Sequence, residues 1–312
     1  MRAVTLESVP SAPAVNDVDA PRPAAGELLV KVAAASVNGI DLATAAGYTQ
    51  AFMEHRFPLV LGQDFAGTVE ELGEGVEGFA VGDAVFGVVL KPYLGAGSLA
   101  QYVTVPAGHG VAHIPAGVKS ADAGALGVAG ATAQVSLDAV ALAEGETLLI
   151  SGASGGVGAL AVQLAAVRGA KVIATARPGA QTDFVTGLTG ADVHVVDFTG
   201  DLQGQVRAIA PEGVDAVLHL AGDGAQLVAL LRPGGQLASA TGLTQDDVKG
   251  QDVTVHTIMS SPDAKLLASL AEQVASGALR VPVTATYPLE RATEAFAAFS
   301  ASTPGKIAVS CS

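Results

Sequence analysis

The chain has 312 residues, half of them hydrophobic, and a mean hydropathy of +0.46. This composition supplies a sizeable core and excludes a disordered chain, and at roughly 150 residues per domain the length suggests about two domains. Lys and Arg number 16 against 30 Asp and Glu, so the net charge is −14. A chain this acidic repels phosphate backbones and anionic lipids, and we expect no nucleic-acid or membrane-surface binding.

Cys311 is the single cysteine of the sequence. A disulfide within the chain and a zinc site of several thiolates are therefore excluded, and we expect Cys311 to lie in a frayed terminus. The first residues lack the apolar run of a signal peptide, and no stretch reaches the ~18 apolar residues of a spanning helix. These features predict a cytoplasmic protein.

Residues 1 to about 120 consist of short apolar runs interrupted by Gly, Pro and Asp. The runs have the alternating or continuous apolar character of partly buried strands. They lie at 27–36, 65–72, 83–89 and 99–106. Glycines recur between them at the spacing of turns. This pattern predicts an antiparallel, barrel-like unit.

From about residue 121, short apolar strands alternate with helical segments. Strands are expected at 147–152, 171–177, 215–222 and 235–242. A helix is expected at 155–169, and a helix followed by a turn at 222–235. Such alternation is typical of parallel strands joined by right-handed crossovers, and predicts an α/β fold with a Rossmann-type doubly wound sheet.

The end of the chain predicts two further helices. Residues 261–280 form an amphipathic helix that Ser261 can cap and Gly277 ends, and residues 290–310 read as helix, turn and strand. We expect the Rossmann-type domain to occupy 121–255. It is inserted into a β-rich domain made of 1–120 and 256–312.

The strongest chemical signal is the glycine-rich turn "SGASGGVG" at 151–158, which follows an apolar strand and opens a helix. A pyrophosphate needs a tight turn, close approach of the backbone and a helix N-terminus. Glycines without side chains permit the approach, a serine hydroxyl adds a donor, and the last glycine lets the helix pack on the strand. The predicted phosphate-binding residues are Ser154, Gly155, Gly156 and Val157. The alternative is a tight strand–helix turn without a ligand.

The end of the second strand of this domain indicates which coenzyme is bound. An NAD site usually places an acidic residue there to bind the ribose 2′-hydroxyl. This chain has Thr175, Ala176 and Arg177, and no acid before Asp183. A cation beside a small polar residue suits a 2′-phosphate, so Thr175 and Arg177 predict NADPH. The alternative is a surface arginine in an NADH enzyme.

Several segments together resemble the medium-chain dehydrogenase/reductase superfamily. The segment "FPLVLGQDFAGTVEELGEGVEGFAVGDAVFG" is similar to its signature. The segments "VNGIDLATAAGY", "SGASGGVGALAVQLA", "ALLRPGGQLAS" and "PGKIAV" resemble the zinc-independent quinone oxidoreductase branch, in the same order. The resemblance covers nearly the whole chain. It implies a GroES-like β-rich domain, an inserted Rossmann domain and an active-site cleft between them.

The chain departs from the zinc-dependent alcohol dehydrogenases of that superfamily. Their Gly-His-Glu triplet is Gly62-Gln63-Asp64 here, and their early cysteine ligand is absent. The six histidines are scattered without the spacing of ligands, at 55, 109, 113, 194, 219 and 256. We therefore expect no catalytic zinc. Catalysis then depends on orientation and electrostatics, with the coenzyme providing the hydride.

The resemblance implies the remaining site residues. Asn38 matches an asparagine near the nicotinamide ribose and the substrate, although it could instead cap a turn. Tyr48 corresponds to an aromatic residue that lines the cleft, and its phenol could bind a carbonyl or donate a proton; it could also be a packing or surface residue. Asp41 is expected at a helix start rather than as a proton donor.

Further cofactor contacts follow from the same comparison. Thr132 matches a threonine near the nicotinamide, and Lys306 matches a lysine close to the coenzyme, although it could be an exposed charge at a strand end. The loops around Ala221 and Gly242 are expected to border the nicotinamide half. Segments 48–57 and 88–98 are expected to shape an apolar pocket or to pack in the core.

The leading hypothesis is an NADPH-dependent reductase of quinones or α,β-unsaturated carbonyl compounds. One alternative is an enoyl or tailoring reductase acting on a polyketide-like intermediate, because fold and cofactor site do not identify the substrate. A second alternative is an NADPH-binding redox sensor without turnover. Relatives are commonly homodimers through the edge of the Rossmann sheet, so a homodimer is expected.

Overall fold

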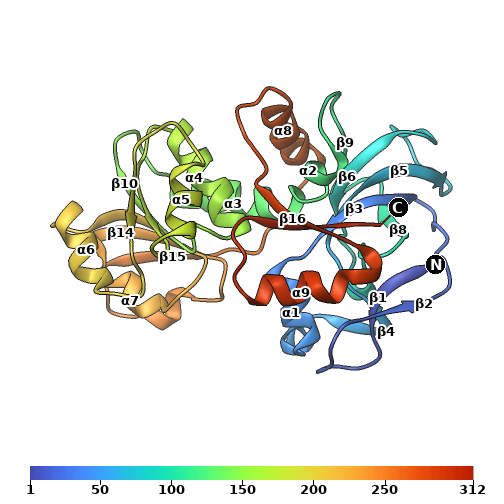
Figure 1. Ribbon diagram of the computed structural model, residues 1–312, viewed down its shortest axis with the longest axis horizontal. Helices are drawn as coiled ribbons and strands as arrows, with labels where there is room; N and C mark the ends of the chain where they lie inside the picture. The colour runs from blue at the N-terminus through green and yellow to red at the C-terminus, as the bar shows by residue number, and fades with distance from the viewer. Residues whose placement is uncertain (312) are drawn as a thin grey trace. The chain divides into compact units, whose positions relative to one another are not determined.

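The computed structural model describes residues 1–311, and these form two compact units (Figure 1). Unit 1 comprises residues 1–131 and the chain from Ser261 onward, and unit 2 comprises Thr132–Ser260. Unit 1 is rich in antiparallel strands, whereas unit 2 is built on a parallel sheet. The described chain therefore has the α/β class that the sequence predicts, with a Rossmann-type sheet inserted into a GroES-like β-rich unit.

Unit 1 contains a seven-stranded sheet and a four-stranded sheet. The larger sheet has the order β16-β17-β3-β5-β6-β9, with β8 pairing β3, and the smaller has the order β2-β1-β4-β7. Their bounds are β1 Arg2–Leu6, β2 Ala14–Asp17, β3 Glu27–Ser36, β4 Glu54–Val60, β5 Asp64–Leu72, β6 Ala84–Val88, β7 Tyr93–Ala96, β8 Tyr102–Pro106, β9 Val111–His113, β16 Val283–Pro288 and β17 Lys306–Ser310. The strands predicted at 27–36, 65–72, 83–89 and 99–106 are all present.

The core of unit 1 consists of apolar side chains that extend from these strands and pack against one another. Leu28, Val30 and Val32 on β3 pack with Phe65 and Val69 on β5 in one buried cluster. Their alternation along each strand follows the two-residue period of a pleated strand. The helical segments around this core are α1 Gly39–Ala45, η1 Tyr48–Ala51, α2 Ser120–Ala123, α8 Ala264–Ala275, η3 Leu289–Arg291 and α9 Ala292–Ser300.

The N-cap of helix α8 lies two residues after the expected cap, Ser261. Asp263 is its N-cap and accepts a hydrogen bond from the amide of Leu266, because a carboxylate close to the helix start satisfies a free N–H group. Ser261 is therefore not the cap, and its hydroxyl lies 3.1 Å from Nε2 of His109. The other end agrees with the sequence, since Gly277 follows the last turn with φ +77°.

Unit 2 has a six-stranded parallel sheet in the order β12-β11-β10-β13-β14-β15. Its strands are β10 Thr147–Ser151, β11 Lys171–Thr175, β12 Val193–Val196, β13 Val214–His219, β14 Leu231–Ser239 and β15 Val253–Thr257. The helical segments are α3 Gly127–Ala139, which spans the boundary between the units, and α4 Gly156–Val167, α5 Ala180–Thr186, α6 Leu202–Ile209, α7 Gly224–Val228 and η2 Gln245–Val248. The turn predicted at the end of 222–235 instead lies within β14, where Gly235 pairs with Val253 of β15 and the pairing with β13 shifts register between Leu231 and Gln236.

Cys311 lies in the buried core of unit 1. The side chain of Cys311 is 4% exposed, and its amide donates to the carbonyl of Ala33 at 3.1 Å. The expectation of a frayed terminus is wrong, because β17 joins the large sheet beside β3 and carries Cys311 into the core. Burial raises the pKa of its thiol to about 12.

Candidate active site

The glycine-rich turn lies at the carboxyl end of β10 in unit 2. Strand β10 ends at Ser151, and α4 begins at Gly156 with Gly155 as its N-cap. Gly152 has φ +81°, a conformation that glycine adopts without strain. A Cβ on Gly158 would lie 2.2 Å from the carbonyl oxygen of Gly152, so the last glycine is what allows α4 to approach the strand.

The same turn leaves space where a phosphate would approach. A Cβ on Gly155 would meet only the Gly152 carbonyl, at 3.4 Å, and otherwise open space. Ser154, Gly155, Gly156 and Val157 are all half-buried there. The first amides of the twelve-residue helix α4 have no partner within the helix, and its N-terminus carries partial positive charge. This cradle fits a diphosphate.

Hydrogen bonds join the turn to its neighbouring strands. The amide of Gly152 donates to Oγ1 of Thr175 at 2.9 Å, and the hydroxyl of Ser151 donates to the carbonyl of Ala221 at 2.5 Å. Thr175, predicted to contact the coenzyme, is buried and directs its hydroxyl to the glycine turn. The carboxyl ends of β10, β11 and β13 are thus held together at one edge of the sheet, where open α/β sheets bind ligands.

Arg177 lies two residues beyond the end of β11 and is exposed. The centre of its guanidinium group lies 5.6 Å from the ring centroid of Phe198, and it takes part in no ion pair with another described residue. Its backbone amide donates a hydrogen bond to Oε1 of Gln181 at 3.1 Å. Its charge is therefore available for an anionic group.

The other predicted cofactor contacts of unit 2 lie on separate elements. Ala221 follows β13 and Gly242 follows β14, and both are exposed, whereas Thr132 is buried on α3. Gly242 has φ +95°, and a Cβ there would meet open space.

A buried polar cluster in unit 1 brings together two predicted residues that are 268 positions apart. The Nζ of Lys306 donates to Oδ1 of Asn38 at 2.6 Å, and it lies 3.4 Å from Oδ2 of Asp64. The Nδ2 of Asn38 donates to the same Asp64 oxygen at 2.9 Å. Lys306 is 3% exposed, so it is not an exposed charge at a strand end.

Asp64 is the residue of this cluster that the sequence did not indicate. Its carboxylate also accepts from the hydroxyl of Ser36 at 2.5 Å and from the amide of Val128 at 2.6 Å, and its side chain is fully buried. The signal available was its position in the triplet Gly62-Gln63-Asp64, which appeared only as a departure from a metal motif. Lys306 can only donate, so it fixes the Asn38 oxygen toward itself and the Asn38 nitrogen toward Asp64.

Asp41 supports the cluster from the first turn of α1. Its carboxylate accepts from the amide of Asn38 at 2.8 Å and from the amide of Gly62 at 3.0 Å, which matches its expected place at a helix start. Burial raises the pKa of Asp41 to about 7, and the negative charge of Asp64 raises it further. The two amide hydrogen bonds and the positive charge of Lys306 act in the opposite direction and lower this pKa. Asn38 is the N-cap of α1, and its side chain hydrogen-bonds Asp64 and Lys306 of the cluster.

Tyr48 lies in η1 and is 76% exposed, and no described hydrogen bond joins it to Asn38, Asp64 or Lys306. Phe52 and Phe57 in the same segment are also exposed, whereas Met53 packs against the core of unit 1. Tyr93 on β7 stacks with the guanidinium of Arg56, whose centre is 3.7 Å from the ring centroid. The segment 48–57 therefore presents aromatic surface.

The residues described offer no metal centre. Among residues 1–311, no three His, Cys, Asp or Glu side chains gather in a geometry that could hold a metal ion. Asp64 already binds a lysine ammonium, an amide and a hydroxyl, and its neighbour in the triplet is a glutamine. The donor set at this position does not suit zinc, which prefers Cys and His ligands.

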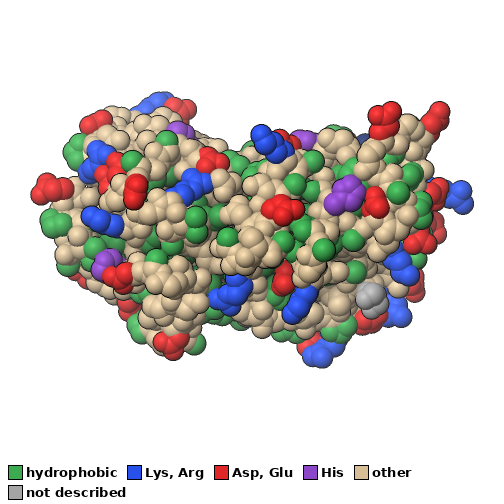
Figure 2. Space-filling model, turned by 90° about the horizontal axis from the view of Figure 1, so that it is seen from above, with side chains coloured by type: hydrophobic (Ala, Val, Ile, Leu, Met, Phe, Trp, Pro, Cys, Tyr) green, Lys and Arg blue, Asp and Glu red, His purple; other side chains and the backbone are tan. Residues whose placement is uncertain are grey.

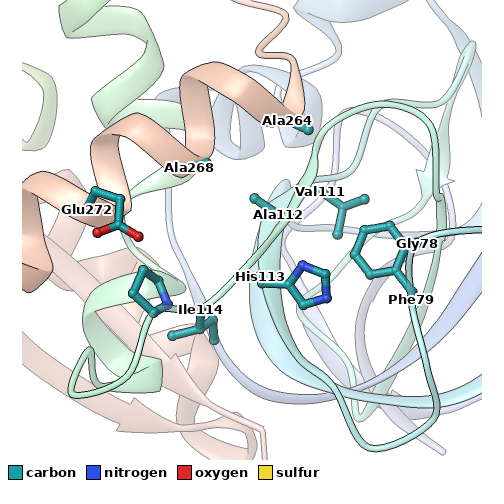
Figure 3. Close-up of a pocket in the computed structure, with 10 residues that line it drawn as sticks. Gly78, Phe79, Val111, Ala112, His113, Ile114, Ala264, Ala268 and Glu272 are labelled. Carbon is teal, nitrogen blue, oxygen red and sulfur yellow. The ribbon is translucent and has the colours of Figure 1, made fainter.

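A separate cavity of about 390 Å³ opens in unit 1 where α8 passes β9 (Figure 3). Ala264, Ala268 and Glu272 of α8 face it from one side. His113 and Phe79 stand on the other, stacked with ring centroids 4.8 Å apart. His113 also lies 3.1 Å from the carboxylate of Asp83. The cavity contains none of the predicted site residues.

On the face shown in Figure 2, acidic and basic side chains are interspersed, and no continuous basic patch appears. None of the helices in the part of the chain that the structure describes has the length and apolar character needed to cross a membrane.

Two family models match the chain. One, described as an alcohol dehydrogenase GroES-like domain, matches residues 24–116, and the other, described as a zinc-binding dehydrogenase, matches residues 189–309. Among solved structures, the quinone oxidoreductase from Coxiella burnetii has a TM-score of 0.87 at 26% identity, covering 100% of this chain and 99% of that one. A mycobacterial protein complexed with NADPH has a TM-score of 0.87 at 29% identity, covering 99% and 100%.

Relatives in sequence are oxidoreductases by name. The chain is 36% identical over 211 residues to the chloroplast envelope quinone oxidoreductase homolog of Arabidopsis thaliana, covering 65% of this chain and 62% of that protein. It thus spans less than two thirds of that relative. It is 31% identical over 317 residues to the mitochondrial NAD(P)H oxidoreductase of Homo sapiens, covering 86% and 78%. With these relatives and both family models, the chain belongs to the medium-chain dehydrogenase/reductase superfamily, among its quinone oxidoreductase-like members.

Proposed function

We propose that this chain is an NADPH-dependent oxidoreductase that reduces a quinone or an α,β-unsaturated carbonyl compound without a metal. The observation that carries the proposal is the glycine cradle between β10 and α4, with its open approach at Gly155 and the free amides of α4. The likeness to a structure complexed with NADPH and to proteins named quinone oxidoreductases supports the coenzyme and the substrate class.

NADPH rather than NADH is proposed from the end of β11. Arg177 is exposed there without a carboxylate partner among the described residues, and no acidic side chain occurs between the end of β11 and Asp183 to take a ribose 2′-hydroxyl. A guanidinium group binds phosphate through several donors, and this one lies beside the ring of Phe198. Arg177 is therefore proposed to bind the 2′-phosphate.

When bound, NADPH supplies a hydride from its nicotinamide C4, which with one proton reduces a quinone carbonyl or a conjugated double bond. The chain orients the reactants. Asn38 is proposed to lie beside the nicotinamide ribose and the substrate, since Lys306 and Asp64 hold its amide in one orientation and its Nδ2 also lies 3.4 Å from the carbonyl oxygen of Ser36. Tyr48 is proposed to bind the substrate carbonyl or to donate the proton.

A reaction without a metal is proposed because the ammonium group of Lys306 lies beside the carboxylate of Asp64. Its ammonium lies 3.4 Å from Oδ2 of Asp64, so the carboxylate already has a positive partner.

A homodimer is also proposed, through β15, the strand at one edge of the unit 2 sheet, because an unpaired edge strand can pair with a second copy. Size-exclusion chromatography with light scattering tests the dimer.

The function is tested by two measurements on the full chain. Titration calorimetry should give a lower Kd for NADPH than for NADH in the wild type, and Arg177→Ala should remove most of that difference. A panel of quinones and enones should oxidise NADPH in the presence of the protein, and added EDTA should leave the rate unchanged. Tight NADPH binding without turnover on any acceptor would instead support a redox sensor, and binding of neither coenzyme would refute the proposal.

Tyr48 needs its own variant. Tyr48→Phe should lower kcat/KM on the best acceptor about 10²-fold if the hydroxyl takes part in proton transfer. Tyr102→Phe is the matched control, since it removes a hydroxyl from a half-buried strand residue of the same unit. An unchanged kcat/KM in Tyr48→Phe would remove the hydroxyl from the mechanism.

A further inference from the structure

His219 is a buried titratable residue that the proposed reaction does not use. It is the last residue of β13, and 4% of it is exposed. Its ring lies between the loop that follows β13 and the loop that follows β14. The contacts come from the carbonyl of Gly222 on the first loop, from the hydroxyl of Ser239 at the end of β14, and from the hydroxyl of Thr241 on the second loop.

The hydroxyl of Ser239 determines which ring nitrogen of His219 carries the proton. Its Oγ accepts from the amide of Thr241 at 3.3 Å and from the amide of Leu243 at 3.1 Å. A hydroxyl has two acceptor positions and one donor, so these amides leave only the O–H for a further bond. This O–H lies within reach of two acceptors, Nδ1 of His219 at 3.1 Å and Oγ1 of Thr241 at 3.3 Å. Since the Ser239 oxygen has no acceptor position left, its bond to the ring requires that Nδ1 accepts.

The opposite nitrogen then bears the hydrogen. Nε2 lies 3.2 Å from the carbonyl oxygen of Gly222, which can only accept, so Nε2–H donates to it. Oγ1 of Thr241 is nearly equidistant from the two nitrogens, at 3.1 and 3.0 Å, and is compatible with this arrangement. Asp223, the next carboxylate along the chain, uses Oδ1 to cap α7. A neutral ring with its proton on Nε2 donates to the Gly222 carbonyl and accepts from the Ser239 hydroxyl.

The two loops joined by His219 lie on the half of the sheet opposite the adenosine side. The sheet order places β11 on one side of β10, and β13 and β14 on the other. A dinucleotide with its diphosphate on the β10–α4 turn extends along the carboxyl edge in both directions. Since Arg177 follows β11, the nicotinamide half falls over the loops after β13 and β14, which contain Ala221 and Gly242.

We infer that His219, as the neutral Nε2–H tautomer, is a positioning residue that fixes these two loops for the nicotinamide half of the coenzyme. The inference rests on the proposed NADPH function. It assigns His219 no contact with the reacting atoms. Removing the ring frees the Gly222 carbonyl and the Ser239 hydroxyl, so both loops lose their mutual anchor, whereas the glycine cradle keeps its own bond to Thr175.

The tautomer can be measured without any coenzyme. In a long-range proton–nitrogen correlation spectrum of the ¹⁵N-histidine-labelled full chain at neutral pH, the His219 signals are assigned by their loss in His219→Gln. The expected pattern is a protonated Nε2 and an unprotonated Nδ1. A protonated Nδ1, whether in the other tautomer or in an imidazolium, would overturn the inference. This outcome is independent of whether NADPH binds.

The positioning role is tested by comparing the Kd values of two ligands. NADPH contains the nicotinamide half, whereas 2′,5′-ADP lacks it. His219→Leu should raise the Kd of NADPH about tenfold and change that of 2′,5′-ADP less than twofold, because two hydrogen bonds are lost on the nicotinamide side alone. His256→Leu is the matched control on β15, and should leave both values near those of the wild type.

Two further variants keep the test decisive. His219→Gln retains a donor near the position of Nε2 and should hold the NADPH Kd within about threefold of the wild type. Ser239→Ala removes the hydroxyl bound to Nδ1 and should weaken NADPH several-fold while sparing 2′,5′-ADP, even if His219→Leu does not fold. Equal losses for both ligands would show a role in folding only, and no loss for NADPH would also refute the inference. If the wild type binds 2′,5′-ADP but not NADPH, the proposed function fails, while the tautomer result stands.

Discussion

The ammonium of Lys306 donates a hydrogen bond to the side-chain oxygen of Asn38 at 2.6 Å, although 268 residues separate them in the sequence. The contact exists because β17 pairs antiparallel with β3, and Asn38 follows β3 by two residues. Asp64 at the start of β5 supplies the negative charge between them.

Removing only one partner of the buried Lys306–Asp64 pair should strongly lower the free energy of unfolding. Lys306→Met leaves the Asp64 carboxylate buried without its cation, and we expect a loss of about 3–5 kcal/mol in the free energy of unfolding, measured in urea. Adding Asp64→Asn removes the charge and should restore part of the loss. Lys249→Met is the control, because Lys249 is exposed in its pair with Asp246. A loss no larger than in this control would contradict the pairing.

Asp41 should make stability depend on pH in an unusual direction. Its pKa is raised from 3.8 to about 7 in the folded state, chiefly by burial, so between these values the folded chain binds more protons than the unfolded chain. Its contribution to stability is therefore fully present below pH 4, falls as pH rises from about 4 to 7, and is constant above. The upper bound of this change is about 4 kcal/mol.

The Asp41 effect is measured as a difference. Urea unfolding of the wild type and of Asp41→Asn is compared from pH 4 to 8, and the advantage of the wild type should shrink up to pH 7. Asp83→Asn is the control: its pKa is lowered by the Ala80 amide, then by His113, so its contribution is lost toward acid pH instead. An Asp41 difference that grows with pH would contradict the raised pKa.

Gly158→Ala should disrupt both the fold of unit 2 and coenzyme binding. The added Cβ would lie 2.2 Å from the carbonyl oxygen of Gly152, so α4 or the turn must move. We expect a loss of about 2 kcal/mol or more in stability and a raised Kd for NADPH. Gly190→Ala adds the same methyl group where nothing lies within 4 Å, and it should change neither quantity. Normal NADPH binding by Gly158→Ala would show that the close packing is not required.

The thiol of Cys311 should be inert in the native protein. It is 4% exposed and its pKa is raised to about 12 by burial, so almost none is thiolate at neutral pH. A thiol reagent should label the native chain far more slowly than the chain in 6 M guanidinium chloride. Rapid labelling of the native chain would mean that β17 frays.

Local sequence patterns determined much of this fold. The apolar period of β3, β5, β10 and β11 and the glycine spacing before α4 act over a few residues, so they can be read without knowing the fold. The phosphate cradle, its helix and the residue that follows β11 are visible for this reason. The resemblance to a superfamily, carried by motifs spread along the chain, is confirmed by the family models and relatives.

Only the tertiary structure decided which distant side chains meet. The Asn38–Asp64–Lys306 cluster depends on the pairing of β17, β3 and β5, and the bonds of His219 depend on β13 lying beside β14. The burial of Cys311 and the choice of Asp263 over Ser261 as a cap are likewise products of packing and backbone geometry. Strand neighbours are selected by burial of the whole apolar surface, which a local pattern does not contain, and this is why the contacts of Asp64 and His219 could not be predicted from the sequence.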